Sequence, residues 1–287
     1  PMYVLSTNCL YYYSYILADK MAHELGEKEK YYDKAKKMHE SVNRFFWNEK
    51  KGTYNYIYDD FGGCESQEGL GISFAILFGI ADAEKIKKII NNHKTTDYGI
   101  PCVYPSFSRY NTPSGMTFGR HSGTVWPHVQ GFWSDALIRN GNSDLFDKEL
   151  RLQTENALRF YQFAEIYHPL NGSMYGGAQE LDGKGIVYNY WDCKPCQTWS
   201  ATAYLRNIYM DLIGLRFCED GIMFVPSGTK LTNQINLQNL KYRKSLLNIK
   251  ISGIGMKIKS FKINGNKSSP FIKKDLIGLQ CIEIELN

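Results

Sequence analysis

The first two-thirds of the chain carries apolar side chains at three- and four-residue spacing, which is the pattern of amphipathic helices. This spacing predicts seven helices, over residues 6–25, 30–47, 65–79, 82–93, 123–141, 142–164 and 197–214. The first helix is apolar on nearly every side, so we expect it to be buried all round, with Ser6 as its N-cap. The second has one apolar stripe, which includes Ala35 and Val42, opposite a face rich in Lys and Glu. Inner and outer helices therefore alternate, as in a barrel of helical hairpins.

The pattern changes after Gly221, where apolar and polar residues alternate with a period of two. Leu247, Ile249 and Ile251 alternate with polar residues, and the pair Asn264-Gly265 is typical of a hairpin turn. We therefore expect a helical domain over residues 1–218 and a small β-domain, part of a sandwich, over residues 219–287.

The strand-rich segment carries most of the basic excess. Residues 221–274 hold eleven Lys or Arg and no Asp or Glu, in a chain of net charge +5. A basic sheet can contact nucleic acid. These lysines, however, mostly occupy the polar positions of the strands, with few aromatic residues between them, so we expect a solvated face and no nucleic-acid partner.

The length of the chain limits the number of domains that it can form. At 287 residues the chain can hold one large domain, or a large and a small one. No run of eighteen apolar residues occurs, so no membrane span is predicted, and the first residues lack the features of a signal peptide.

Seven scattered cysteines do not form a disulfide framework, which favours, without establishing, a reducing compartment such as the cytoplasm. Cys193 and Cys196 form a CxxC pair, but no second pair completes four metal ligands, so we expect neither metal nor cofactor.

Aromatic residues make up 14% of the chain. They suit contact with carbohydrate, because sugar rings stack on flat side chains, and they equally suit the core of a large helical protein. Polar and aromatic residues gather in the long loops and at the starts of inner helices: Glu65, Gln67, Glu68, Arg120, His121, Trp126, Glu165, Tyr167, Tyr190, Trp191, Gln197 and Trp199. In a helical barrel these positions meet at one mouth, where carboxylates, amides and indoles are suited to bind a sugar.

Four segments carry a resemblance to a known family: GTVWPHVQGF, FAEIYHPLNGSMYGG, QTWSATAYL and NLKYRKSLLNIKISG. They resemble the second half of a six-hairpin (α/α)6 glycoside hydrolase, most nearly the family-sixty-three-like enzymes, whose relatives include the trehalases and glucosidases. The resemblance covers residues 1–215, approximately. It implies a mainly α fold, in which a partial (α/α)6 barrel is followed by a small β-sandwich.

By this resemblance Glu165, in the Glu-x-Tyr motif, matches the general base of an inverting hydrolase that acts on α-linked sugars, a glucoside or a mannoside. An ionised Glu165 would take a proton from the water that attacks the anomeric carbon. We expect the substrate to be bound by Glu68, His121, Trp126, Tyr167, Trp191, Gln197 and Trp199. For Trp126 and Trp199 core packing is an equal alternative, and Glu68 or Gln197 could instead cap the helix that it precedes.

In the resembled family the general acid is an aspartate in a Trp-Asp loop, just upstream of the helix that residues 4–15 resemble. The chain begins at Pro1, so we expect this aspartate on chain that is missing here. Oligomeric state and the choice between glucose and mannose stay open. Two other classes also remain: a carbohydrate-binding helical barrel without chemistry, and a polysaccharide lyase on the same architecture, in which Arg120 and His121 would face a uronate.

Overall fold

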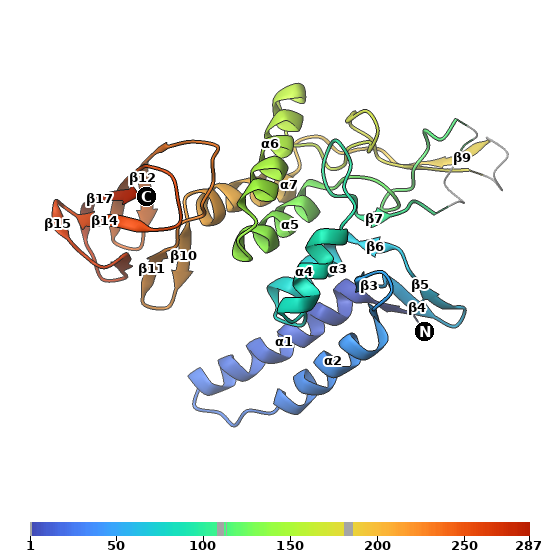
Figure 1. Cartoon of the computed structure of the whole chain (residues 1–287), viewed down its shortest axis with the longest axis horizontal. Coiled ribbons are helices and arrows are strands. Elements are labelled where there is room, and N and C mark those ends of the chain that lie inside the picture. The colour runs from blue at the N-terminus through green and yellow to red at the C-terminus, as the bar shows by residue number, and fades with distance from the viewer. Residues whose placement is uncertain (1, 108–111, 113, 181–185) are drawn as a thin grey trace. The chain divides into compact units, whose positions relative to one another are not determined.

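A computed structural model describes residues 2–107, 112, 114–180 and 186–287 (Figure 1). Seven α-helices and one π-helix lie in these residues, and every segment predicted as helical contains one of them. The helices are α1 (Leu5–Glu24), α2 (Tyr32–Phe45), α3 (Gly69–Leu77), α4 (Ala83–Asn92), α5 (Pro127–Arg139), α6 (Ser143–Phe160), α7 (Thr198–Arg206) and the π-helix η2 (Asn207–Leu212).

Short strands connect the helices, and longer strands follow them. The strands are β1 (Tyr3–Val4), β2 (Trp47–Asn48), β3 (Thr53–Tyr54), β4 (Ile57–Asp59), β5 (Gly62–Cys64), β6 (Gln67–Glu68), β7 (Val103–Tyr104), β8 (Ala178–Glu180), β9 (Val187–Tyr190), β10 (Leu215–Cys218), β11 (Gly221–Phe224), β12 (Gln234–Tyr242), β13 (Ser245–Ser252), β14 (Ile258–Ile263), β15 (Asn266–Lys267), β16 (Phe271–Lys273) and β17 (Gly278–Leu286). The fold is therefore a mixture of helices and small sheets, and "mainly α" is too narrow a description of it.

The chain divides into two compact units. The first contains residues 1–136 and 152–203, and the second contains residues 137–151 and 204–287. Residues 137–151, where α5 ends and α6 begins, therefore group with the strands that follow. The division near residue 218 stays a prediction.

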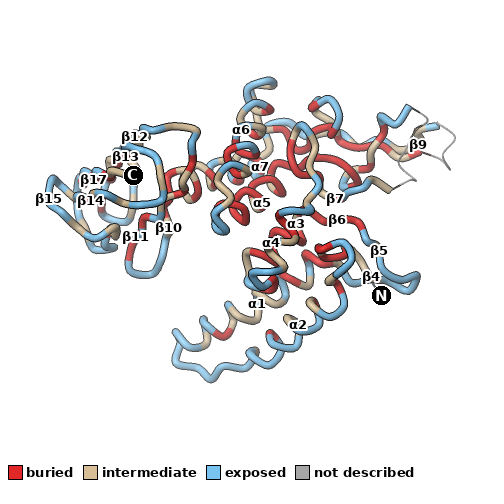
Figure 2. Tube along the Cα trace, in the orientation of Figure 1, coloured by how far each residue is buried: buried red, intermediate tan, exposed pale blue. Residues whose placement is uncertain are grey.

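In the first unit α1 and α2 lie side by side, and α1 also packs against α3 (Figure 1). The expectation that α1 is buried on every side is wrong. Its buried residues are Leu5, Ser6, Cys9 and Asp19, whereas Leu10, Tyr11, Leu17 and Met21 are exposed (Figure 2). Its main neighbours, α2, α3 and β1, cover only part of its circumference.

The burial expected for α3 is confirmed, because seven of its nine residues are buried. Ser6, by contrast, is not an N-cap. The N-cap of α1 is Val4, and Ser6 lies inside the helix, where its backbone N donates to Glu68 Oε2 at 3.0 Å. A side chain from the residue before α3 therefore satisfies a free N–H at the start of α1.

The second unit contains a five-stranded sheet, of order β12-β13-β17-β14-β15, and a three-stranded sheet, of order β10-β11-β16. Burial along β13 alternates as predicted, with Leu247, Ile249 and Ile251 buried. Asn264 and Gly265 form the predicted turn between β14 and β15 at positive φ, 51° and 78°. One apolar core takes side chains from both sheets, including Leu215, Ile222, Ile272, Leu247, Ile249 and Ile282.

Candidate active site

Glu165 lies in the segment that follows α6, which ends at Phe160. The residue is buried, with 3% of its surface exposed. Its Oε1 accepts a hydrogen bond from Nη2 of Arg120 at 2.5 Å, and its Oε2 accepts one from the backbone N of Lys194 at 3.1 Å. The backbone N of Glu165 donates in turn to the carbonyl of Lys194 at 3.0 Å. Two segments distant in the sequence therefore hold this carboxylate.

Arg120 is itself held at several atoms. Its Nη1 donates to the carbonyl of Asp192 at 3.3 Å. Its own carbonyl accepts from Thr124 Oγ1 at 2.6 Å and from Trp126 Nε1 at 2.8 Å. The guanidinium carbon also lies 5.4 Å from the centre of a Trp126 ring, within the range of a cation–π contact. Arg120 thus joins the glutamate to the tryptophan.

The glycine pair of the SMYGG segment allows this close packing. A Cβ on Gly177, which has φ of 111°, would lie 2.6 Å from the backbone N of Arg120. A Cβ on Gly176 would lie 1.7 Å from the carbonyl oxygen of Trp191. Only glycine at these positions lets the chain pass against the segments that carry Arg120 and Trp191.

Four rings cluster at the start of α5 and α7. Trp126 lies 4.6 Å from His121 in a stacked arrangement, 5.4 Å from His128 edge to face, and 6.0 Å from Trp199. Trp126 is buried, whereas Trp199 is 47% exposed and His121 is also exposed. The cluster therefore presents part of its aromatic surface to solvent.

The pKa values of both histidines of this cluster are lowered. His121 is exposed as a residue, but its ring stacks on Trp126, and the resulting desolvation lowers the pKa of His121; the charge of Arg120 lowers it further, and Glu165 opposes this effect. Burial, together with His121, lowers the pKa of His128 to about 4. The Nδ1 atom of His128 is buried and has no hydrogen-bond partner among the described residues.

A pocket of about 280 Å³ opens beside these groups. It is lined by Tyr56, Val103, Phe107, Arg120, His121, Ser122 and Trp191. Arg120 is the lining residue that also binds Glu165, so the guanidinium connects the pocket to the buried carboxylate. Of the residues predicted from the sequence, the structure thus gathers Glu165, His121, Trp126, Trp191 and Trp199 around Arg120.

Tyr167 and Gln197 lie in the framework of this region. Tyr167 is 1% exposed, packs with Val125 and Ala164, and its hydroxyl accepts from the backbone N of Ala164 at 3.3 Å. The backbone N of Gln197 donates to the carbonyl of Phe163 at 2.8 Å, and its carbonyl accepts from Ala201 at the start of α7.

Glu68 is also buried, with 5% exposed, and its carboxyl group binds the backbone of Ser6. Burial raises the pKa of Glu68 to about 7, and the hydrogen bond from Ser6 only partly offsets that increase. Its position therefore suits a carboxyl group that holds two helix starts together.

Sequence reasoning missed two features of this region. The Cys193-Lys194-Pro195-Cys196 segment, which resembles a redox motif by its letters, supplies through Lys194 the backbone contacts to Glu165. Glu180, on β8, is 2% exposed, and neither of its carboxylate oxygens has a hydrogen-bond partner in the part of the chain that the structure describes. Neither feature has a local sequence signal, because both depend on which segments meet in space.

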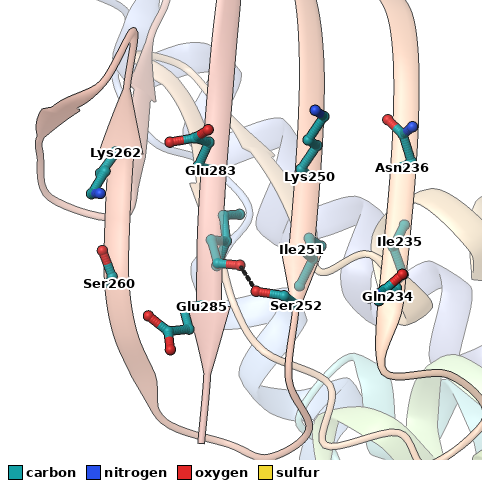
Figure 3. Close-up of a pocket in the computed structure, with 11 residues that line it drawn as sticks. Gln234, Ile235, Asn236, Lys250, Ile251, Ser252, Ser260, Lys262, Glu283 and Glu285 are labelled. Atoms are coloured by element: carbon teal, nitrogen blue, oxygen red, sulfur yellow. Dashed lines mark hydrogen bonds between the residues drawn. The ribbon is translucent and has the colours of Figure 1, made fainter.

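A larger pocket, of about 660 Å³, lies on the five-stranded sheet of the second unit. Figure 3 shows Lys250, Glu283 and Lys262 in a row across β13, β17 and β14, as the strand register requires. Positive and negative side chains alternate there, and the lining residues include no aromatic ring. These are the polar positions of the strands, so the surface matches the solvated face expected from the sequence.

No group of three or more His, Cys, Asp or Glu side chains suited to a metal ion occurs among the described residues. All seven cysteines are free thiols. Within the described ranges, no helix combines the length and the apolar character that crossing a membrane requires.

Residues 1–200 match the protein family described as "Mannosylglycerate hydrolase MGH1-like glycoside hydrolase domain". The match covers more than half of the chain, and the chain therefore belongs to this family of glycoside hydrolases. The resemblance to the family-sixty-three-like enzymes is thereby confirmed. No curated protein sequence matches the chain.

Solved structures share the fold at low identity. The GH63 mannosylglycerate hydrolase from Thermus thermophilus in complex with Tris is 18% identical, with a TM-score of 0.51, over 73% of this chain and 45% of that chain. The same enzyme in complex with Tris and D-glycerate is 17% identical, with a TM-score of 0.51, over 73% of this chain and 46% of that chain. The GH78 family rhamnosidase of Bacillus sp. GL1 is 16% identical, with a TM-score of 0.56, over 99% of this chain and 27% of that chain. The chain thus spans less than half the length of each structure.

Proposed function

We propose that the protein acts as an inverting glycoside hydrolase on an α-linked glucoside or mannoside, with Glu165 as the general base. The observation that carries the proposal is the placement of the Glu165 carboxylate, which Arg120 links to a pocket lined by His121 and Trp191. Membership of a glycoside hydrolase family supports it.

The geometry around Glu165 suits a base. An ionised carboxylate offers about four lone-pair positions, and Arg120 and the amide of Lys194 use two of them. In this proposal the remaining positions bind a water molecule and take its proton as the water attacks the anomeric carbon. An inverting reaction also requires a general acid, held about 6.5–9.5 Å from the base so that the water fits between them.

The aromatic cluster suits a sugar-binding wall. We assign contact with the sugar to His121, Trp191 and Trp199, because these rings border the pocket or reach solvent beside Arg120. Trp126, predicted as a fourth contact, is buried and supports the wall by stacking on His121. Flat rings bind the apolar faces of a pyranose, and the imidazole of His121 can hydrogen-bond to a hydroxyl. In this proposal Glu68, Tyr167 and Gln197 contribute through the positions of the helices and loops that bear the wall.

The finer architecture belongs to the same proposal. We infer that the helices form part of an (α/α)6 six-hairpin barrel, which the alternation of exposed α2 and buried α3 supports. We infer a β-sandwich in the second unit, because its two sheets share one apolar core.

A Glu165→Gln variant tests the function. A protein that also carries the general acid, and its Glu165→Gln variant, are assayed on α-glucosides, α-mannosides, α-rhamnosides and mannosylglycerate, the last two because structural neighbours are named for those substrates. We expect activity on one class, loss of about 10³-fold or more in kcat in the variant, and retained binding of the product sugar. Retained turnover would remove the base assignment.

The anomer released first distinguishes the mechanism. An inverting enzyme frees a β-anomer from an α-glycoside, which proton NMR detects before mutarotation. Binding of sugars without turnover on any member of the panel would favour the carbohydrate-binding alternative. An unsaturated uronate product would favour a lyase, although the guanidinium that a lyase would direct at the substrate is here paired with Glu165.

A further inference from the structure

Arg120 contacts three separate parts of the candidate site. It pairs with Glu165, it donates to the carbonyl of Asp192 next to Trp191, and its guanidinium lies over Trp126. We propose that Arg120 is the positioning residue of the general base, and that it sets the direction of the Glu165 carboxylate relative to the aromatic wall. This inference rests on the proposed role of Glu165.

Because Glu165 is buried, its ion pair with Arg120 is needed to stabilise the charge of the carboxylate. Glu165 is 3% exposed, and an ionised carboxylate removed from water requires a compensating charge or several donors. The Lys194 amide supplies one neutral donor at 3.1 Å, and Arg120 supplies the positive charge at 2.5 Å. Hydrogen bonds to ionised groups are the stronger kind, so Arg120 dominates the orientation of Oε1.

Arg120 is placed to fix a direction as well as to supply charge. Its carbonyl accepts from Trp126 Nε1, and its Nη1 donates to Asp192, so both ends of the residue are anchored. A planar guanidinium anchored in this way offers Nη2 to the carboxylate in one orientation. The lysine ammonium carries the same charge, but its three N–H donors lie on one nitrogen, so it cannot reproduce the two separate nitrogens by which Arg120 reaches Asp192 and Glu165.

Arg159 offers a matched control in the same unit. Its Nη1 also donates to a backbone carbonyl, that of Asn171 at 3.2 Å, and its guanidinium also lies over a ring, that of Tyr98 at 5.3 Å. No ion pair of Arg159 with a carboxylate is found within the described residues. The two arginines therefore differ chiefly in the bond to Glu165.

The test compares Arg120→Met, Arg120→Lys and Arg159→Met in a protein that also carries the general acid, on the α-glycoside that it hydrolyses. We expect Arg120→Met to lower kcat by about 10²-fold, the effect of a misplaced catalytic group, with KM changed much less. Added methylguanidine should restore part of the activity of Arg120→Met and none of that of Glu165→Gln. Arg120→Lys should lose about tenfold in kcat, and Arg159→Met should behave as the unaltered chain.

A second measurement is independent of turnover. The amide of Lys194 donates to Glu165 Oε2, so its hydrogen exchange reports where the carboxylate points. We expect faster exchange of this amide in Arg120→Met and no change in Arg159→Met. If Arg120→Met does not fold, Arg120→Lys takes its place in this measurement, with the same expected result.

The outcomes separate the two proposals. If Glu165→Gln keeps its activity, the base assignment fails. If Glu165→Gln is inactive while the Arg120 variants match Arg159→Met in kcat, in guanidine response and in Lys194 exchange, the positioning role is overturned and the base stands. A loss confined to KM, with exchange at Lys194 unchanged, also overturns it, because it would make Arg120 a substrate contact.

Discussion

The imidazole of His121 stacks on the indole of Trp126, with ring centres 4.6 Å apart and planes inclined by 10°. Trp126 is 4% exposed and donates through Nε1 to the carbonyl of Arg120. Trp199, whose ring lies 6.0 Å from that of Trp126, is 47% exposed. Trp126 therefore belongs to the interior, and Trp199 offers a free surface to a ligand.

Replacing Trp199 by alanine should weaken sugar binding with little effect on stability. Loss of one stacked ring is expected to cost about 0.5–1.5 kcal/mol, or roughly two- to tenfold in Kd. Trp126→Ala should instead lower the free energy of unfolding by about 3–5 kcal/mol, because it leaves a cavity. Titration calorimetry and thermal denaturation measure the two effects, and an unchanged Kd in Trp199→Ala would remove this residue from the wall.

Glu68 should make stability depend on pH. Its ordinary pKa of 4.5 is raised by burial to about 7, so the folded state holds a proton that the unfolded state releases. The contribution of Glu68 to stability is complete below pH 4.5 and is lost as pH rises through about 7. Relative to the unaltered chain, Glu68→Gln should therefore gain stability between pH 4.5 and 8, by at most about 3 kcal/mol.

Glu65→Gln is the control for this measurement. Glu65 is exposed and pairs with Lys51 at 2.8 Å, and the hydrogen bond from Lys51 lowers its pKa. Urea denaturation of both variants from pH 4.5 to 8 should show the gain in Glu68→Gln alone. Parallel stability curves for Glu68→Gln and the unaltered chain would contradict the buried, protonated state of Glu68.

The thiols should divide by reactivity in the native chain. Cys196, Cys218 and Cys281 are exposed, whereas Cys9 is buried and burial raises the pKa of its thiol. Because the thiolate is the reacting form, we expect alkylation at the three exposed positions first, and at Cys9 only after unfolding. Peptide mass spectrometry after timed labelling measures the order, and early labelling of Cys9 would show that α1 opens readily.

Asp211 should be important for the stability of the second unit. Its carboxylate is buried, accepts from Arg216 Nη1 at 3.0 Å and accepts from Asn207 Nδ2 at 2.7 Å. Asp211→Ala leaves Arg216 without this partner, and we expect a loss of about 3–5 kcal/mol in the free energy of unfolding.

Asp220→Ala provides the comparison, since Asp220 pairs with Lys274 in a solvent-exposed bridge at 2.7 Å. Such surface pairs contribute little to stability. Chemical denaturation followed by circular dichroism should separate the two variants clearly. Equal midpoints would mean that the buried pair contributes no more than the exposed one.

Local patterns predicted most secondary structure correctly. The three- and four-residue spacing located all seven helical segments, and the alternation around Ile249 located β13. Periodicity succeeds here because it reflects the geometry of one element. It failed for the burial of α1, since the number of neighbours that a helix receives is a property of the whole fold.

The amino-acid sequence alone determined the order of helices and strands and, through its resemblance to glycoside hydrolases, the choice of Glu165 as a candidate base. Only the tertiary structure decided what surrounds that carboxylate: Arg120, 45 residues away, and the Lys194 amide, 29 residues away. The same holds for the different exposures of Trp126 and Trp199. The physical reason is that hydrogen-bonding and ion-pairing partners are selected by proximity in space, whereas repeats of two or 3.6 residues report only the local geometry of the backbone.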